Sequence, residues 1–317
     1  MPSPLDIYEK KFKSLNVNKK SGIYTVGKAP HKPVLLLSII LLNRNNRMDL
    51  ANINTGLQLR EMWNSLWGLL EYEHPGSLHM PLYHMKSEGF WNIRFKTEPP
   101  AQVKSLSGFD SVAERVSLDP ELVQLLEHED SRNVLISALL NGGYFSDLEI
   151  LRLREFIASV DKSFEYEEKV VSMVREEFRF EAPVMAEDLS APMRDASFRR
   201  GVLASYNETC AVCGMRIISS SGISVIDAAH ILPFHRFKND NIRNGLALCK
   251  SHHWLFDHGL ISVDTHYNTL VADSIEIEMP VNVLRQYHRA PIILPREAEK
   301  YPAPAALKWH RENVFAD

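Results

Sequence analysis

Cys210-x2-Cys213 and Cys249-x2-His252 together hold every cysteine of this 317-residue chain. Two ligand pairs with two-residue spacers suit a tetrahedral zinc ion, because each tight turn presents two donors to one metal and pins one end of the loop between the pairs. The alternative is three ordinary buried thiols, but the spacing and the lack of a leftover cysteine favour a metal. The sequence therefore predicts a structural Zn²⁺ site that staples a small domain.

Three further polar residues lie between or beside these pairs. A β-branched run at residues 223–231 contains His230 near its end, and a proline that follows stops the strand. A loop then carries Asn244, and a helix expected from about Ser251 carries His253. A strand, a loop with asparagine and a helix with histidine form the ββα-metal arrangement, which is typical of a nuclease centre.

The composition indicates a soluble globular protein, since 45% of the residues are hydrophobic and 24% are charged. Length alone favours two domains. The longest apolar run, Val34–Leu42, is far too short to cross a bilayer, and residues 1–13 lack the apolar stretch of a signal peptide. We therefore expect no membrane partner and a cytoplasmic location, where cysteines stay reduced and available to a metal.

The charges are distributed unevenly along the chain, although the net charge is only −4. Residues 1–50 hold nine Lys or Arg against three Asp or Glu, whereas residues 110–168 are strongly acidic. A protein that binds a polyanion needs to neutralise phosphates only on the contacting face, so this asymmetry is compatible with a nucleic-acid footprint. The alternative is a set of ordinary solvated helix faces.

The first 163 residues are expected to be mainly helical. Apolar residues recur at helical spacing from residue 33 to about residue 70 and again over 120–160, with a polar turn at 43–47. Between these segments, residues 81–95 hold strand-forming side chains around Ser87-Glu88-Gly89, which predicts a β-hairpin.

The charged stretch 164–192 is the predicted interdomain linker. An Arg-rich amphipathic segment at 194–206 opens the C-terminal domain, 193–317, and leads into the first cysteine pair. The predicted fold class is therefore α+β, with a mainly helical N-terminal domain, 1–163, that includes a β-hairpin, and a zinc-stapled ββα-metal C-terminal domain.

From Cys210 to Asp257 the chain resembles the HNH nuclease family, specifically its zinc-stapled, McrA-like branch. The resemblance is carried by Ala228-Ala229-His230-Ile231, Asn244-Gly245-Leu246 and the His252-His253 pair. It implies that His230 is the general base and that His253 binds a catalytic divalent ion, Mg²⁺ or Mn²⁺. It also implies that Asn244 holds the loop and orients the His230 ring through its amide. We therefore expect an HNH endodeoxyribonuclease.

The sequence departs from this family pattern at one position. Many HNH enzymes place an aspartate immediately before the base histidine, where it supplies a carboxylate to the metal, but this chain has Ala229 there. Asp227 lies two residues further back, on the same strand face as Ala229. Asp227 either supplies the metal carboxylate or is a strand-face acid bonded to a nearby arginine or to solvent.

Two N-terminal segments, 29–37 and 80–91, resemble the sulfur-binding domain that is fused to HNH nucleases acting on phosphorothioate DNA. The resemblance covers roughly residues 25–160. It implies that His31 and Lys32 face the modified phosphate and that Met80, Pro81 and His84 line the sulfur pocket. Sulfur is larger, more polarizable and more weakly hydrated than oxygen, so apolar contacts suit it. The alternative is that these segments simply open a core helix and form a packed hairpin.

The leading hypothesis is a modification-dependent (type IV) restriction endonuclease that recognises phosphorothioated double-stranded DNA and hydrolyses phosphodiester bonds nearby. An alternative mark is a methylated or hydroxymethylated base, for which Trp63, Trp67, Tyr83 and Trp91 would supply an aromatic pocket. An alternative of another class is a non-catalytic, zinc-containing DNA-binding regulator. The oligomeric state, including a homodimer, stays open.

Overall fold

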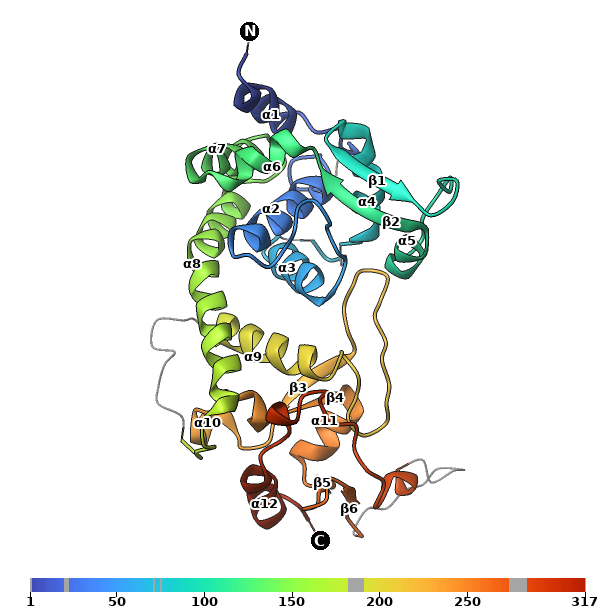
Figure 1. The fold of residues 1–317 in the computed structure, drawn as a ribbon, viewed down its shortest axis with the longest axis vertical. Coiled ribbons are helices and arrows are strands. Elements are labelled where there is room, and N and C mark those ends of the chain that lie inside the picture. Colours follow the sequence, from blue (N-terminus) through green and yellow to red (C-terminus); the bar gives the residue numbers. More distant parts are fainter. Residues whose placement is uncertain are drawn as a thin grey trace. The chain divides into compact units, whose positions relative to one another are not determined.

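The computed structural model describes residues 2–19, 23–70, 72–74, 76–181, 191–273 and 284–316. The chain forms two compact units (Figure 1). The first unit comprises Met1–Asp161 together with Ile218–Ile223, and the second comprises Lys162–Ile217 together with Ser224–Asp317. Both units combine helices with short two-stranded sheets, so the mixed helix and strand class predicted from the sequence is confirmed.

The first unit is mainly helical. Its elements in chain order are α1 (Pro4–Lys13), α2 (His31–Arg44), α3 (Leu57–Trp67), α4 (His79–His84), the 3₁₀ turn η1 (Met85–Glu88), β1 (Trp91–Phe95), α5 (Leu106–Val112), β2 (Ala113–Leu118), α6 (Pro120–Glu127), α7 (Glu129–Leu140) and the start of α8 (Asp147–Ser172).

Helix α2 lies at the centre of this unit (Figure 1). Every residue from Lys32 to Leu42 is buried, because the apolar side chains surround the helix instead of forming one stripe. Helices α3, α4, α6 and α7 contact it. Burial of the nine residues Val34–Leu42 therefore supplies much of the hydrophobic core of the unit.

The predicted β-hairpin at residues 81–95 is wrong. Helix α4 and turn η1 occupy its first half, and Gly89 ends the turn in the left-handed conformation with φ 72°. Pro81 lies in the first turn of α4, where a proline costs no helical hydrogen bond. Leu82 and Met85, three residues apart, are both buried, so packing at helical spacing prevails over the strand propensity of this stretch.

Strand β1 pairs with β2, which lies well beyond the segment predicted as its partner. The pair is antiparallel, with Trp91 opposite Leu118 and a register shift between Arg94 and Phe95. Trp91 and Leu118 are buried at the start of the ladder, and the following residues of β1 alternate between exposed and intermediate. The partner strand follows a further helix, α5, and such long-range pairing has no local sequence signal.

The second unit surrounds a ββα motif. Its elements in chain order are the end of α8, η2 (Met173–Arg175), α9 (Ala191–Ser205), β3 (Ile226–His230), α10 (Phe234–Phe237), η3 (Ile242–Asn244), β4 (Gly245–Cys249), α11 (Lys250–Asp257), β5 (Ile261–Val263), β6 (Thr269–Val271), η4 (Arg285–Tyr287), η5 (Ala298–Lys300) and α12 (Pro304–Asn313). Strands β3 and β4 are antiparallel, with His230 opposite Gly245. Helix α11 follows β4 directly.

Part of the predicted linker is helical. Helix α8 continues to Ser172, and its residues Phe164, Tyr166 and Val170 are buried. A buried ion pair between Glu167 and Arg200, 2.6 Å apart, joins α8 to α9 within the second unit. Residues 182–190, which include Pro183 of the predicted linker, lie outside the described residues. The domain limits 1–163, 164–192 and 193–317 stay predictions.

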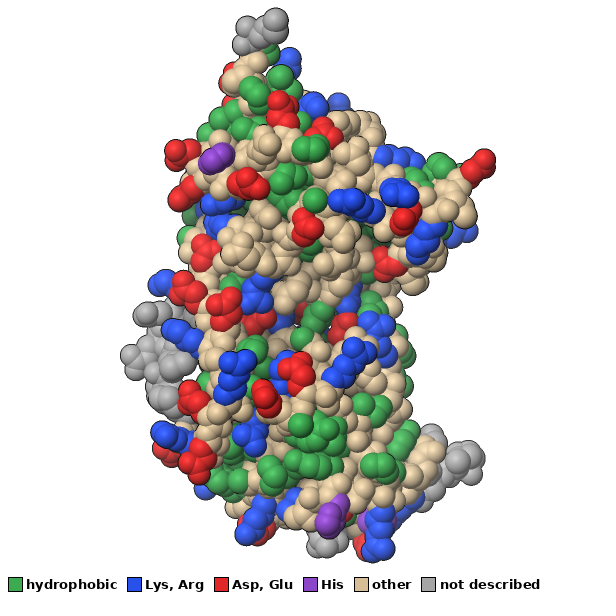
Figure 2. All heavy atoms as spheres, viewed as in Figure 1, with side chains coloured by type: hydrophobic (Ala, Val, Ile, Leu, Met, Phe, Trp, Pro, Cys, Tyr) green, Lys and Arg blue, Asp and Glu red, His purple; other side chains and the backbone are tan. Residues whose placement is uncertain are grey.

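Two surface properties bear on the function. Among the described residues, no helix is both long and apolar enough to cross a membrane. Acidic and basic side chains lie side by side over the face shown in Figure 2, as the small net charge would suggest. On this face, a preference for a polyanion would therefore depend on local sites and not on an extended basic surface.

Candidate metal cluster and nuclease centre

The four residues Cys210, Cys213, Cys249 and His252 converge in the second unit. Their donor atoms all lie within 4.8 Å of one another. His252 Nδ1 is 3.1 Å from Cys249 Sγ and 3.6 Å from Cys210 Sγ. A tetrahedral zinc ion with bonds of about 2.3 Å to sulfur and 2.0 Å to nitrogen requires S···N distances of about 3.5 Å. The cluster could therefore hold one tetrahedral metal ion.

The local fold explains how the two halves of the cluster meet. The amide of Ala211 donates to the carbonyl of Ala247 on β4, at 2.7 Å, which places the first cysteine turn against the strand that ends in Cys249. Cys249 is also the residue that precedes α11, so His252 follows it in the first turn of that helix. One strand–helix junction thus carries half of the ligands.

His230 lies at the end of β3 with its ring fixed on two sides. The ring stacks on Phe198 of α9, with centroids 3.8 Å apart and planes 7° apart. Its Nε2 is 2.8 Å from Oδ1 of Asp240. Opposite His230, Gly245 lets α9 approach, because a Cβ there would run into Val202 and lie 3.0 Å from Phe198. Position 245 must therefore be a glycine if Phe198 of α9 is to stack on the His230 ring.

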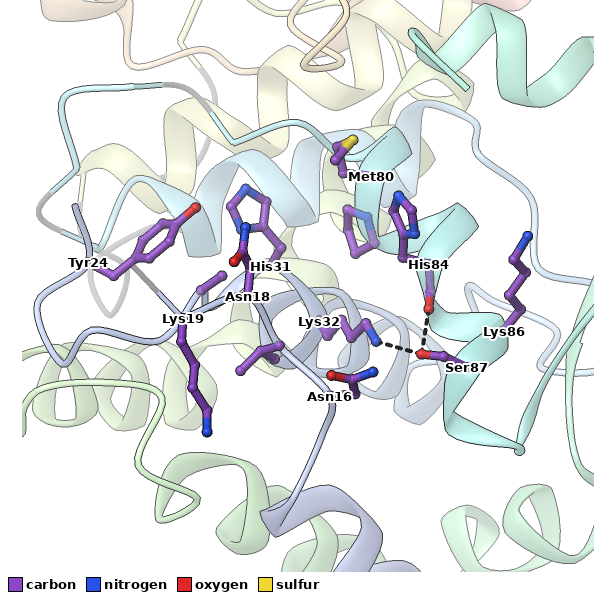
Figure 3. A pocket seen from close by; sticks show the side chains of 13 residues that line it. Asn16, Asn18, Lys19, Tyr24, His31, Lys32, Met80, His84, Lys86 and Ser87 are labelled. Atoms are coloured by element: carbon purple, nitrogen blue, oxygen red, sulfur yellow. Dashed lines mark hydrogen bonds between the residues drawn. The ribbon is translucent and has the colours of Figure 1, made fainter. Parts of the chain in front are cut away.

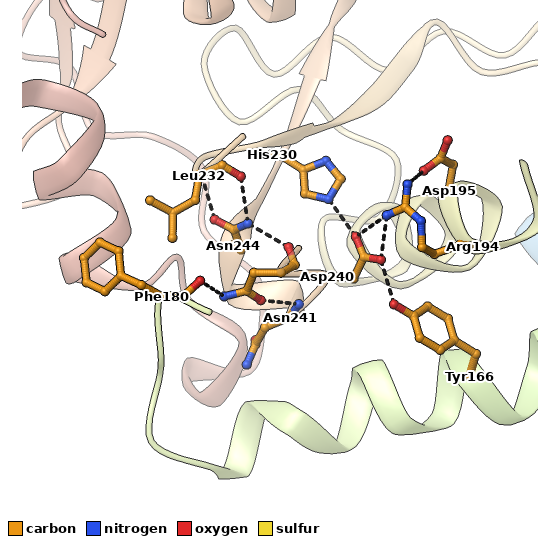
Figure 4. Close-up of polar contacts among 10 residues, drawn as sticks. Tyr166, Phe180, Arg194, Asp195, His230, Leu232, Asp240, Asn241 and Asn244 are labelled. Carbon is orange, nitrogen blue, oxygen red and sulfur yellow. Dashed lines mark hydrogen bonds and ion pairs between the residues drawn. The ribbon is translucent and has the colours of Figure 1, made fainter. Parts of the chain in front are cut away.

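Asp240, the acid that contacts the His230 ring, was not singled out by the sequence analysis (Figure 4). It is buried, and its Oδ2 accepts hydrogen bonds from the Tyr166 hydroxyl at 2.7 Å and from Arg194 Nη1 at 2.8 Å. Burial raises the pKa of the Asp240 carboxyl, but the hydrogen bonds of His230 and Tyr166 and the Arg194 charge outweigh it, so the pKa is lowered. The available signal was an acid between two asparagines, a composition typical of turns, inside the ββα loop.

The Asn244 side chain holds the loop, as the family resemblance implied, but its hydrogen bonds go to the backbone and not to the His230 ring. Its side-chain Oδ1 accepts from the amide of Leu232 at 2.8 Å, and its Nδ2 donates to the carbonyls of Leu232 and Asn239. The amide is completely buried and thus ties the chain after β3 to the loop before β4. Asn244 acts on the backbone of the loop, and the ring is held by Asp240.

Asp227 and His253 meet beside the N-terminal end of α11. His253 Nδ1 lies 3.9 Å from Asp227 Oδ2, and His253 Nε2 lies 3.4 Å from Asp257 Oδ2. The two carboxylates lie against different nitrogens of the ring, so only one of them can share an ion with His253. A carboxylate and an imidazole are donors that Mg²⁺ or Mn²⁺ accepts. Asp227 also pairs with Arg199 at 2.5 Å and with Lys250, so an incoming ion would compete with Lys250, whose side chain is 68% exposed and free to turn away.

The residues predicted for DNA recognition line one pocket of the first unit (Figure 3). The pocket has a volume of about 950 Å³. His31 and Lys32 begin α2, while Met80, Pro81 and His84 belong to α4. The other lining residues are Asn16, Val17, Asn18, Lys19, Tyr24, Ala29, Lys86 and Ser87.

The charges of this pocket differ from those expected. Lys32 forms an ion pair with Glu88 and is only 9% exposed, so its charge is neutralised internally. Lys19 and Lys86 are exposed. Burial lowers the pKa of His31 to about 4, which keeps its imidazole neutral at pH 7. Burial and the nearby Lys32, Lys86 and His79 also lower the pKa of His84.

The four aromatic residues considered for an extruded base do not line this pocket. Trp63 and Trp67 stack on each other with centroids 5.4 Å apart, and both are buried. Trp91 donates its indole N–H to the carbonyl of Leu82 at 3.0 Å, and Tyr83 bonds to the carbonyl of Pro100. These side chains belong to the core of the first unit.

Residues 210–264 match the HNH endonuclease family. One similar solved structure is the modification-dependent TagI restriction endonuclease, with 23% sequence identity and a TM-score of 0.30. That likeness covers 39% of this chain and 40% of the other chain. No curated protein matches the chain significantly. The matched segment begins at the first cluster cysteine and includes β3, β4 and α11, with His230, Asn244 and His253. Residues 210–264 therefore form an HNH endonuclease domain.

Proposed function

We propose that this protein is a metal-dependent endonuclease that hydrolyses phosphodiester bonds in DNA. The observation that carries the proposal is the arrangement within the HNH domain of a fixed imidazole, His230, and a separate donor set at Asp227 and His253. His230 takes the proton of the attacking water. Asp227 and His253 would hold Mg²⁺ or Mn²⁺, which when bound stabilises charge on the phosphate and on the departing oxygen.

We further propose that the ion of the Cys210, Cys213, Cys249 and His252 cluster is structural Zn²⁺. The donor distances and the soft three-sulfur set support zinc over the harder cations. The four protein ligands complete a tetrahedron and leave no open position for substrate. The catalytic ion and the structural ion are thus separate in this proposal.

The recognition target that we propose is a phosphorothioate group in double-stranded DNA. Support comes from the pocket of the first unit, whose lining includes an apolar edge at Met80 and Pro81, the exposed Lys19 and Lys86, and no carboxylate. The lysines would meet the charge of the phosphate, and the apolar edge would meet the sulfur, which loses less hydration than oxygen. His31 would contribute a neutral N–H, and Lys32 would hold Ser87 and Glu88 in place.

The test is digestion of three matched plasmids by the full-length protein with Mg²⁺ or Mn²⁺. One plasmid carries phosphorothioate linkages, one carries methylated cytosines and one is unmodified. We expect cleavage of the phosphorothioate plasmid alone. Cleavage of the methylated plasmid alone would replace the proposed target by a base mark, and no cleavage of any plasmid with either ion would overturn the nuclease proposal.

Met80→Gln is expected to weaken binding to a duplex with a single sulfur by about tenfold, which corresponds to ~1.4 kcal/mol, and to change binding to the plain duplex by less than about twofold. Gln has nearly the length of Met but replaces a polarizable thioether by a hydrated amide. Paired binding titrations measure the effect. Met80→Leu, which keeps an apolar side chain, is the control and should retain most of the preference. An equal loss on both duplexes would mean that Met80 has no part in sulfur selection.

Lys32→Ala is expected to lower the free energy of unfolding of the first unit by about 3–5 kcal/mol, because Glu88 is then left buried without its cation. Denaturant titration measures this change. Lys86→Ala is the matched control, since it removes the same charge from the exposed rim. This variant should leave the free energy of unfolding unchanged. The slope of log K for DNA binding against log salt concentration should become shallower by about 0.9. The reverse pattern would assign the phosphate contact to Lys32.

A further inference from the structure

The two nitrogens of the His230 ring have different surroundings. Nε2 lies 2.8 Å from the Asp240 carboxylate, whereas Nδ1 makes no hydrogen bond within the described residues. In Figure 4 the second ring nitrogen points away from Asp240. The His230 side chain is 20% exposed, so one edge of the ring is held inside the protein and the other remains accessible.

The partners of Asp240 keep it an anion whatever the state of His230. Its side chain is 1% exposed, and a buried carboxylate without a cation would be strongly disfavoured. Arg194 supplies that cation at 2.8 Å, and its guanidinium lies 3.3 Å from the centroid of the Phe234 ring, which limits its movement. Arg194 Nη1 lies nearer to Oδ2, at 2.8 Å, than to Oδ1, at 3.1 Å, and the Tyr166 hydroxyl donates to Oδ2. The shortest hydrogen bond of Oδ1 is therefore the one to His230, at 2.8 Å.

An ionised carboxylate can only accept hydrogen bonds, so the hydrogen of a neutral His230 ring must reside on Nε2. The lone pair is then on Nδ1. We propose that Asp240 is the positioning residue that selects this tautomer, that Nδ1 of His230 is the atom that accepts the proton of the attacking water, and that Arg194 and Tyr166 hold Asp240 for this task. The catalytic part of this inference rests on the proposed nuclease function.

The proton and bond changes balance without transfer to Asp240. The water oxygen forms a bond to phosphorus, its proton moves to Nδ1, the bond from phosphorus to the departing oxygen breaks, and solvent protonates that oxygen. His230 becomes an imidazolium and keeps its Nε2–H on Asp240, which stabilises the new positive charge. Asp240 contacts neither the substrate nor the water, and it therefore acts through His230.

The test is Asp240→Asn in the full-length protein. To keep Arg194 partnered, the new amide oxygen faces the guanidinium and the NH₂ group faces Nε2, which forces the hydrogen of His230 onto Nδ1. We expect kcat to fall roughly 10²- to 10⁴-fold with little change in KM. The ¹⁵N NMR spectrum of histidine-labelled protein, recorded without the divalent ion, should show Nε2–H in the wild type and Nδ1–H in the variant.

Two further variants keep the test decisive. Asp195→Asn is the matched control, because it removes the other carboxylate of Arg194, which is 60% exposed, without touching His230. It should retain the wild-type rate and tautomer. Tyr166→Phe removes one hydrogen bond from Asp240 and should lower kcat by about tenfold without changing the tautomer, which gives a second reading if Asp240→Asn does not fold.

The inference is overturned if the wild-type ring carries its hydrogen on Nδ1, or if Asp240→Asn keeps both the wild-type tautomer and the wild-type kcat. The tautomer measurement needs no cleavage. A protein that cuts no DNA but shows Nε2–H in the wild type and Nδ1–H in Asp240→Asn would therefore refute the nuclease proposal while supporting the role of Asp240.

Discussion

His230→Ala is expected to reduce the rate of DNA cleavage by roughly 10²- to 10⁴-fold, the usual contribution of a general base. Metal content and DNA binding should stay at wild-type levels, because His230 is not one of the cluster ligands and lies in a different unit from the proposed recognition pocket. Single-turnover cleavage of a phosphorothioate duplex measures the rate, and metal analysis with binding titrations measures the rest.

The matched control for this variant is His235→Ala. His235 is five residues further along the chain, in α10, and is exposed. We expect it to cleave at the wild-type rate. Cleavage by His230→Ala at the wild-type rate would show that His230 is not the general base. Another residue of the HNH domain would then have to take the proton of the attacking water.

Cys249→Ser is expected to release the structural ion and unfold the second unit. A structural zinc contributes on the order of 10 kcal/mol to folding, which is comparable to the whole stability of an ordinary domain. Cys249 is well placed for so large an effect, since it ends β4, precedes α11 and lies 3.1 Å from His252. Metal analysis and limited proteolysis of the full-length protein measure the loss, and a protease-resistant fragment of the first unit should survive.

His252→Asn and His258→Asn form a matched pair for this prediction. Both histidines follow β4 closely, but His252 belongs to the cluster whereas His258 lies just after α11, with its ring stacked on the exposed Trp254. The first variant should behave like Cys249→Ser, and the second should keep its metal and its fold. A folded Cys249→Ser protein without metal that still cleaves DNA would contradict the structural role of the cluster.

The parts of the fold that could be predicted from the sequence depend on local signals. A single turn sets the spacing within each ligand pair, Cys210 with Cys213 and Cys249 with His252. The structure brings these four residues together as predicted. The strand that ends in His230 and the helix that carries His253 also follow from short patterns. Within a segment of a few residues, the periodicity of apolar side chains largely decides the backbone conformation.

The parts that could not be predicted depend on residues that are distant in the sequence. The stretch 81–95 has strand-forming residues, yet packing makes its first half helical and its true strand partner lies beyond α5. The environment of Asp240 involves Tyr166, which is 74 positions away in the chain. Lys32, which was expected to meet the phosphate, instead forms an ion pair with Glu88, 56 positions away. No local pattern reports such pairs, because the free energy that selects them comes from burial in the folded chain.

The apolar surface of α2 has a consequence for synthesis of the protein. This helix is buried by α3 and α4, but also by α6 and α7, which emerge from the ribosome later. The gap from Arg44 to Glu129 takes roughly 4–17 s to translate at about 5–20 residues per second. During that interval the segment Val34–Leu42, which is apolar except for Ser38, is not yet fully buried. The nascent N-terminal unit therefore passes through a stage at which chaperones that bind exposed apolar segments have an obvious target.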